Sequence, residues 1–245
     1  MQSEPLILKI AKQRFGEPKF PQVHFTGDKK QDKLLNDLKE YPHLFVLACL
    51  MDRQIPAEKA WGIPYAVCSK LKTFHLTELT NIPLTTFQNI FITKRLHRFN
   101  KPMAEIFYQA IQDINKKYQG NAAKIWANKP SSSSVVCRFL EFKGCGIKIA
   151  TMAANILARQ FKIPFSDFYS IDISPDIHIR RVMKRMGYIS NSSDTNMVIY
   201  KAREIYPPFP GIIDFSCWEI GRNFCHPTNP YCKDCPVSSE CQKNF

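Results

Sequence analysis

The sequence has no apolar stretch long enough to cross a lipid bilayer. A membrane-spanning helix needs roughly 18 to 20 consecutive apolar residues, and no segment approaches that length. The opening string MQSEPLILKIAKQRF also lacks the ordered regions of a secretory signal peptide. We therefore expect a soluble, intracellular protein, in the cytoplasm and nucleoid or in the nucleus, with no membrane partner.

The sequence also lacks a convincing run of the alternating pattern that marks a half-buried β-strand. Apolar residues recur instead at helical spacing, interrupted by Pro, Gly and Asn. The pattern predicts a buried helix at residues 43–51 and further helices at 57–71, 102–118 and 147–161, with Ser131 to Ser134 as a loop that enters a helix. The fold is therefore predicted to be all-α.

The nine cysteines do not form the pattern of a secreted disulfide framework, because their number is odd and four crowd into the last 21 residues. These four have the spacing C-x6-C-x2-C-x5-C and are Cys225, Cys232, Cys235 and Cys241. The short loops between them leave little core in which thiols could be buried, whereas one tetrahedral centre would order the segment. The pattern therefore predicts a metal centre.

The spacing favours an iron-sulfur cluster over zinc. Structural zinc sites usually pair their ligands in two C-x2-C knuckles, and only one such knuckle is present here. Zinc stays open as the second candidate. The other cysteines are expected to be small buried hydrophobic residues; they are Cys49, Cys68, Cys137, Cys145 and Cys217.

The charge balance favours a polyanionic partner. Lys and Arg number 34 against 21 Asp and Glu, which gives a formal net charge of +13. The segment from Phe91 to Pro130 alone is net +6. Nucleic acid is the first candidate partner, and a basic protein without such a partner is the alternative.

The segment FLEFKGCGIKIATMAANIL, residues 139–157, is typical of a helix, a tight turn and a second helix. Gly144 and Gly146 stand where such a turn needs positive φ or close backbone approach. The free N–H groups of the second helix would then bind a DNA phosphate without reading sequence. The alternative is a glycine pair needed for steric reasons alone.

Lys148 is expected within the first turn of the second helix, where the helix dipole disfavours an added positive charge. A neutral lysine amine can attack the anomeric carbon of a deoxyribose, expel the base and leave a Schiff base. The alternative is a surface lysine that only touches phosphate.

Asp176 is the expected partner of this lysine. It is predicted in the first turn of a helix that Pro175 begins, so its carboxylate would stay ionised. It could stabilise oxocarbenium-like charge or assist proton movement. The alternative is a charge that satisfies backbone donors, and Asp172 ranks second for the same role.

Three separated motifs resemble the endonuclease III family of helix-hairpin-helix DNA glycosylases, which includes the mismatch adenine glycosylases. The family hairpin L-P-G-V-G-x-K-T-A resembles F-K-G-C-G-I-K-I-A at residues 142–150. The cysteine spacing is that of the family's cluster loop. The family's V-D-T-H-x-x-R-V motif has counterparts in Asp176, Ile177, His178, Arg181 and Val182. A weaker fourth match, LACLMDRQIPAEKAW, resembles the family's L-L-S-x-Q-x-x-D helix end.

The resemblance implies a base-excision repair enzyme, a DNA glycosylase with associated AP lyase activity that uses Lys148 and Asp176. It implies a 4Fe-4S cluster on the four C-terminal cysteines, and damaged double-stranded DNA as the partner of an expected monomer. It makes Gln54 the wedge that enters the duplex when the nucleotide flips. Lys143, Gly144 and Gly146 would contact the DNA backbone.

The predicted architecture is two helical domains flanking a DNA-binding cleft. One domain covers residues 43–160 and carries the helix-hairpin-helix; the other joins residues 1–42 and 161–245 and carries the cluster. A lysine at position 148 marks the bifunctional class, because the adenine glycosylases carry another residue there. Oxidised pyrimidine is the default substrate.

Three features depart from the family pattern. The connector between Lys148 and Asp176 looks longer than usual, HPTNPY between Cys225 and Cys232 holds no basic residue, and Lys143 replaces the usual hairpin proline. Two other functions stay open: a glycosylase that removes a mismatched, deaminated, alkylated or oxidised purine base without cutting the strand, and a non-catalytic DNA-binding module.

Overall fold

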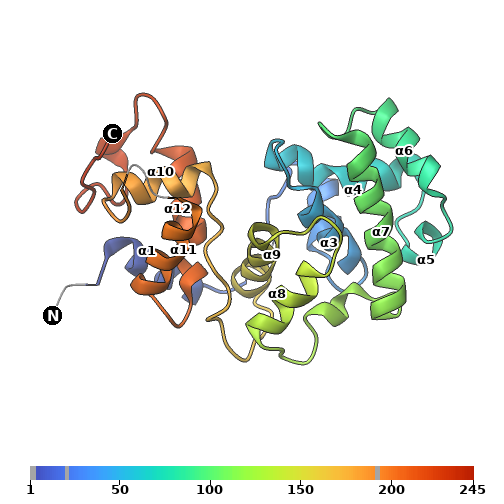
Figure 1. Ribbon diagram of the computed structural model, residues 1–245, viewed down its shortest axis with the longest axis horizontal. Helices are drawn as coiled ribbons and strands as arrows, with labels where there is room; N and C mark the ends of the chain where they lie inside the picture. Colours follow the sequence, from blue (N-terminus) through green and yellow to red (C-terminus); the bar gives the residue numbers. More distant parts are fainter. Residues whose placement is uncertain (1–3, 20–21, 191–193) are drawn as a thin grey trace. The chain divides into compact units, whose positions relative to one another are not determined.

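The computed structural model describes residues 4–19, 22–190 and 194–245, and over these residues it contains helices and no strand (Figure 1). The prediction of an all-α fold is confirmed. The chain divides into two units by its internal contacts. Unit 1 comprises Met1–Lys19, Ser131–Val136 and Ala154–Phe245, and unit 2 comprises Phe20–Pro130 and Cys137–Ala153.

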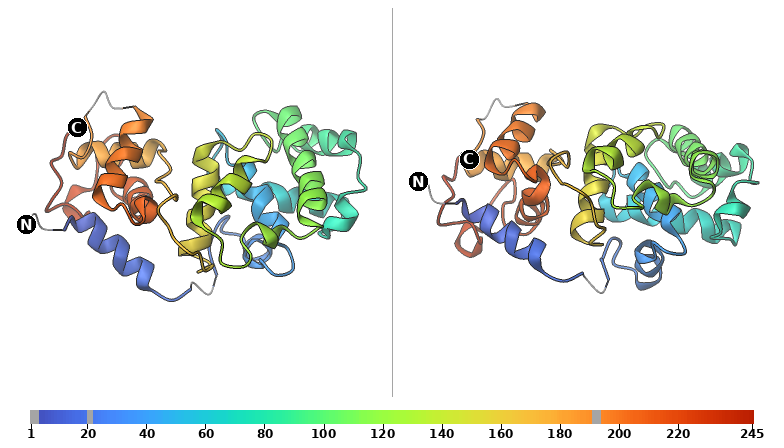
Figure 2. Two further views of the ribbon diagram at one scale, coloured as in Figure 1. Left: turned by 60° about the horizontal axis from the view of Figure 1, so that its bottom comes forward. Right: turned by 90° about the horizontal axis from the view of Figure 1, so that it is seen from below.

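Unit 2 is built around α3 (Pro42–Met51), all ten residues of which are buried. The helix packs against α4 (Ala57–Leu71) and α7 (Asn100–Tyr118). Figures 1 and 2 show α6 (Leu84–Thr93) beside α7, with which it packs. The remaining elements of the unit are α2 (Lys29–Asn36), α5 (Leu76–Leu79) and η1 (Ala122–Ile125).

The core of unit 2 is rich in aromatic side chains that water does not reach. Its fully buried phenylalanines are Phe45, Phe87, Phe91, Phe107 and Phe139. Burial of each such side chain contributes roughly 1.5 to 3 kcal/mol to folding. The apolar character of α3 is therefore that of a core helix, and no described helix is both long and apolar enough to span a membrane.

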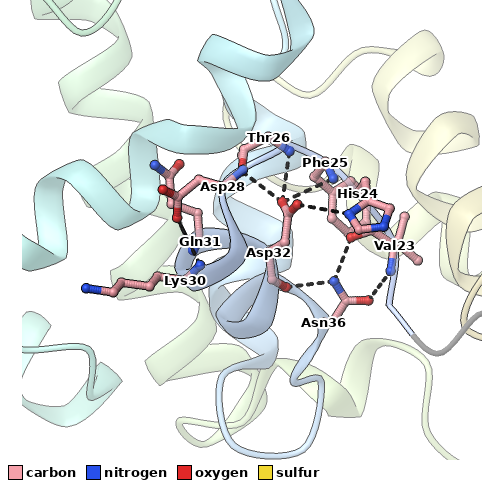
Figure 3. A network of polar contacts seen from close by, with 9 residues as sticks. All are labelled: Val23, His24, Phe25, Thr26, Asp28, Lys30, Gln31, Asp32 and Asn36. Atoms are coloured by element: carbon pink, nitrogen blue, oxygen red, sulfur yellow. Dashed lines mark hydrogen bonds and ion pairs between the residues drawn. The ribbon is translucent and has the colours of Figure 1, made fainter.

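A buried carboxylate fixes the segment that precedes α3 (Figure 3). The side chain of Asp32 is 1% exposed, and its Oδ1 accepts hydrogen bonds from the N–H groups of Phe25 and Thr26 at 3.1 and 2.8 Å. Asn36 Nδ2 donates to the carbonyl of Asp32 at 2.7 Å. The ring of Phe25 stacks on Trp61 at a centroid distance of 4.2 Å. This segment is therefore held on unit 2 by both polar and aromatic contacts.

Unit 1 packs α12 (Asp214–Asn223) against α10 (Ile177–Arg185). Gly221 permits this approach, because a Cβ at this position would lie 2.7 Å from the Cβ of His178. The other elements of the unit are α1 (Leu6–Gly16), α11 (Thr195–Ile205), η2 (Pro210–Ile213) and η3 (Cys232–Asp234). Within the unit, α1 packs on η2 and α12, and α11 packs on η2.

Two helices, α8 (Ser132–Leu140) and α9 (Ile147–Arg159), have residues in both units. Compact groups of contacts are not by themselves independently folding domains, so the domain boundaries expected from the sequence at residues 43 and 160 stay a prediction. The helices expected at 43–51, 57–71, 102–118 and 147–161 correspond to α3, α4, α7 and α9 within two residues at each end. The predicted helix entry at Ser131 to Ser134 corresponds to the start of α8 at Ser132.

Candidate active site

The hairpin is a tight turn between α8 and α9, and its two glycines have different roles. Gly144 has φ +81°, and a Cβ there would lie 2.6 Å from Ile106 Cδ1 on α7. Gly146 has no positive φ and open space around it, so the expected steric need for glycine is wrong at this position. Its carbonyl instead accepts the N–H groups of Ile149 and Ala150, both at 3.0 Å, and so begins α9.

The connector that follows α3 lies against this turn. Arg53 Nη1 donates to the carbonyl of Gly144 at 3.3 Å. The next residue, Gln54, is exposed and has φ +54°, which turns the chain toward α4. The structure therefore brings the predicted wedge residue onto the same unit as the hairpin. The sequence analysis missed Arg53, although it lies in the segment that resembles the family's helix end.

Lys148 lies in the first turn of α9, and its side chain is 42% exposed. Its Nζ is 3.6 Å from Oδ2 of Asp52, whose side chain is only 13% exposed. The second hairpin lysine, Lys143, has its Nζ 3.7 Å from Oε2 of Glu105. Asp52 was also missed from the sequence; its signal was its place two residues before Gln54 in that same segment.

Asp176 is the N-cap of α10 rather than a residue of its first turn. Its Oδ1 accepts the N–H of Ile179 at 2.8 Å, because the first N–H groups of a helix have no partner within the helix. The expected capping role is therefore present. Lys148 belongs to unit 2 and Asp176 to unit 1, and their cooperation stays a prediction.

Two other carboxylates flank Asp176 in unit 1. Asp172, the second-ranked candidate, is buried and receives both Nε and Nη2 of Arg203, at 2.7 and 2.8 Å, so it serves as a structural ion pair. Asp214 Oδ2 accepts the N–H of Ser174 at 2.5 Å. The pKa of Asp214 is raised to about 6, mainly by burial and in smaller part by the nearby charge of Asp176.

The four C-terminal cysteines line one pocket of unit 1, together with apolar side chains that include Ile220 and Val237. Burial raises the pKa of the Cys235 thiol, and the neighbouring thiols of Cys225, Cys241 and Cys232 also raise it. Within the described part of the chain, no three His, Cys, Asp or Glu side chains are placed to hold a single metal ion. The four thiols thus share a space without converging on one point.

The remaining cysteines are not all buried. Cys49, Cys68 and Cys217 are buried, as expected. Cys137 is exposed and Cys145 is partly exposed, so the expected burial is wrong for Cys137. The reason is that Cys137 falls on the outward side of the amphipathic helix α8, whose neighbouring Val136 and Phe139 are buried.

Two arginines of α10, four residues apart, hold the loop that begins at Cys225. Arg181 donates from Nε to the carbonyl of Cys225 at 2.5 Å and from Nη2 to that of Gly221 at 2.8 Å. Arg185, which is 8% exposed, donates from Nη1 to the carbonyl of His226 at 2.6 Å. The same Nη1 lies 3.4 Å from Cys225 Sγ. A buried cation therefore faces the cysteine cavity.

Four cysteine thiols beside a guanidinium are suitable ligands for a thiolate-bound metal centre. A cluster holds four thiolates around a core of several atoms, so its ligands stand further apart than ligands of one ion. The shared cavity provides such a space, and the Arg185 guanidinium offers a hydrogen-bond donor to an anionic thiolate. The donor set therefore suits an iron-sulfur cluster.

Comparison with known proteins identifies relatives of this fold. No family model matches the chain. The endonuclease III of Thermotoga maritima is 26% identical over 103 residues, which are 42% of this chain and 44% of that protein. The chain thus spans less than half the length of the curated relative that it matches.

Solved structures match over a longer range. The structure of a trapped covalent intermediate of endonuclease III with DNA is 17% identical, with a TM-score of 0.63 over 100% of this chain and 98% of that chain. A thermostable thymine-DNA glycosylase is 14% identical, with a TM-score of 0.62 over 98% of this chain and 96% of that chain. The chain therefore shares the fold of these proteins, as the sequence resemblance predicted.

Proposed function

We propose that this chain, whose fold is that of the helix-hairpin-helix DNA glycosylases, removes a damaged base from double-stranded DNA. The observation that carries the proposal is a partly exposed lysine, Lys148, in the first turn of the helix that follows the hairpin. One protein of this fold was captured as a covalent intermediate with DNA. The net charge of +13 suits a polyanionic partner.

The proposed reaction proceeds through a Schiff base on Lys148. The neutral amine forms a bond to the anomeric carbon while the glycosidic bond breaks, and the base leaves with the bonding electron pair. The ionised carboxylate of Asp176 would stabilise positive charge on the sugar as that bond breaks. Opening of the sugar gives the Schiff base, and β-elimination then cuts the strand. Oxidised pyrimidine is the default substrate.

The DNA contacts are proposed on the side of unit 2 that carries the hairpin. In the turn formed by Gly144 and Gly146, the N–H of Cys145 already donates to the carbonyl of Phe142 at 3.0 Å. The N–H group that follows Gly146 would bind a phosphate, since the first turn of a helix has donors without a partner inside the helix. Lys143 would add one charge to this contact, and its side chain is 60% exposed. Gln54, exposed at the end of the α3 connector, would fill the gap left by the flipped nucleotide.

We also propose that Cys225, Cys232, Cys235 and Cys241 hold a 4Fe-4S cluster, with zinc as the alternative. Their shared cavity and the facing guanidinium of Arg185 support this assignment. When bound, the cluster would order the C-terminal loop and supply a centre for electron transfer. An absorbance band at about 400 nm in the purified protein, typical of iron-sulfur ligation, would test the assignment.

The proposed function is tested by borohydride trapping on a panel of duplexes, each with one lesion: thymine glycol, 8-oxoguanine, uracil, hypoxanthine or an alkylated base. We expect a covalent adduct with at least one duplex, and none with Lys148→Ala. Lys70→Ala, at an exposed lysine of α4, is the matched control and should trap like the unchanged protein. A Lys148→Ala protein that still traps would contradict the assigned nucleophile.

Two further outcomes on the same panel would replace the proposal. Strand cleavage that needs added alkali, without any adduct, would indicate a glycosylase that acts without a Schiff base. Binding to every duplex without product would indicate a DNA-binding module.

A further inference from the structure

The amine of Lys148 has a carboxylate neighbour within its own unit. The distance from Nζ to Asp52 Oδ2 is 3.6 Å, and Asp52 is the less exposed member of the pair, at 13% against 42%. We propose that Asp52 is a further catalytic residue, which accepts the proton that Lys148 must lose before it attacks the sugar. This inference rests on the proposed function, since it assigns the proton acceptor of that reaction.

The position of Asp52 is fixed by the core of unit 2. It ends α3, whose ten residues are buried, and its own N–H donates to the carbonyl of Cys49 at 3.2 Å. The following residue, Arg53, is bound to the carbonyl of Gly144 in the hairpin turn. One end of the Asp52 connector is thus anchored in the core and the other on the turn that presents Lys148. A proton acceptor requires this kind of rigid support.

Two other lysine pairs of unit 2 differ from this one in the burial of their carboxylates. Glu105, beside Lys143, is 43% exposed, and Glu141, beside Lys117, is 53% exposed. These are ordinary surface pairs, which contribute little to stability. Asp52 alone of these three carboxylates is withdrawn from solvent. Water screens a partly buried carboxylate less than an exposed one, so its attraction for the Lys148 ammonium is stronger. It is therefore the better placed acceptor for the lysine proton.

The proton transfer balances in atoms and charge. One N–H bond of the Lys148 ammonium breaks as an O–H bond forms on Asp52, which leaves a neutral amine and a neutral carboxylic acid. The amine then uses its lone pair on the anomeric carbon, and the acid returns the proton to the departing base. Asp52 ends as a carboxylate. The resting distance of 3.6 Å is long for a hydrogen bond, and such contacts commonly shorten in the substrate complex.

The test is single-turnover trapping at saturating enzyme, measured from about pH 6 to about pH 9, where an ordinary lysine amine is largely protonated. In the unchanged protein the proton passes within the pair, so the rate should depend little on pH. In Asp52→Asn the amine must lose its proton to the solvent. We expect a rate about 100-fold lower near neutral pH, which then rises about tenfold per pH unit.

Two further variants decide between chemistry and packing. Asp52→Glu keeps a carboxylate and should restore much of the rate at low pH. Glu141→Gln removes an exposed ion pair of similar length, 3.4 Å, and should leave the profile unchanged. An Asp52→Asn rate equal to that of the unchanged protein, or one lowered by the same factor at every pH, would overturn the proposal.

Failure of the proposed function has a different signature. If the unchanged protein forms no adduct on any lesion, both the Schiff base mechanism and the role of Asp52 are wrong. If it traps and Lys148→Ala does not, the proposed nucleophile stands whatever Asp52→Asn does. The two claims are therefore separable in one set of gels.

Discussion

The hairpin of unit 2 and the α10–α12 region of unit 1 use charge in opposite ways. The hairpin cations are exposed or partly exposed and their ion pairs are long: the side chains of Lys148 and Lys143 are 42% and 60% exposed, with partners at 3.6 and 3.7 Å. In unit 1, Arg185 is buried and donates to the carbonyls of His226 and Pro227 at 2.6 and 2.9 Å. The hairpin cations can therefore bind a ligand, whereas the Arg185 cation is used in hydrogen bonds that stabilise the fold.

This difference distinguishes residues that can bind DNA from residues that stabilise the folded protein. An exposed ion pair such as that of Lys143 and Glu105 contributes up to about 1 kcal/mol, so a phosphate can replace Glu105 at little cost. Removal of one member of a buried polar network leaves the other groups without partners and costs several kcal/mol. Substitutions in the hairpin should therefore change activity more than stability, and those around Arg185 should do the reverse.

The largest stability effect is expected at Arg185. Arg185→Ala removes the donor of three contacts, to the carbonyls of His226 and Pro227 and to Cys225 Sγ, and leaves the partly buried acceptors of Cys225 and His226 without this donor. We expect a loss of about 4 kcal/mol in the free energy of unfolding, measured by urea denaturation with circular dichroism.

Arg180→Ala is the control for this loss. Arg180 is exposed on the same helix, and its substitution should change stability by no more than about 0.5 kcal/mol. If both substitutions lowered the free energy of unfolding equally, the buried contacts of Arg185 would not be what stabilises unit 1.

The next effect concerns pH and Asp214. Burial raises the pKa of this carboxyl from 3.8 to about 6 in the folded protein. The folded state therefore holds its proton more tightly than the unfolded state, and this stabilisation is full below about pH 4 and is lost as the pH rises through about 6. The change in pKa corresponds to roughly 3 kcal/mol. Asp214→Asn should remove this loss between pH 4 and 7.

The measurement is the free energy of unfolding at each pH for both proteins. Glu204→Gln changes an exposed carboxylate of α11 and is the control. Its free energy of unfolding should depend on pH as that of the unchanged protein does. A constant difference between Asp214→Asn and the unchanged protein over this range would show that Asp214 does not titrate there.

The smallest effect is expected at Lys143. Lys143→Gln removes one exposed charge beside the turn, and we expect DNA affinity to fall about threefold without a change in stability. The slope of log K against log salt concentration should decrease in magnitude by about one, as expected for one lost phosphate contact. An unchanged slope would place Lys143 outside the DNA contact.

The sequence predicted the bounds of four helices within two residues, whereas it missed others, among them the polar α2 and the apolar α6. The periodic pattern of α3, α4, α7 and α9 is set by burial, which the order of apolar residues records. The helix α2 was missed because its sequence, KKQDKLLN, is mostly polar; it is held by its Asp28 cap and by the buried Asp32. The hydrogen bonds of Asp32 depend on residues outside the helix, which the order of polar and apolar residues in α2 does not predict.

Some residues of the candidate site could likewise be predicted from the sequence, and others could not. Gly144 could be predicted because a tight turn needs positive φ, and the cysteines because their spacing is unusual. Asp52 lies in the segment that resembles the family's helix end, but its pairing could not be predicted, because its partner Lys148 lies in a hairpin some 90 residues later. Arg185 could not be predicted either, because it binds a loop some 40 residues later. A single charged residue carries no spacing signal of its own.

The division of unit 1 into three stretches of chain has a consequence for synthesis. Ile7, Leu8 and Ala11 of α1 are buried, and the helix packs on η2 and α12. Those partners leave the ribosome long after all of unit 2, whose last residue is Ala153. The apolar side of α1 therefore stays without these partners until residues 210–223 have been translated.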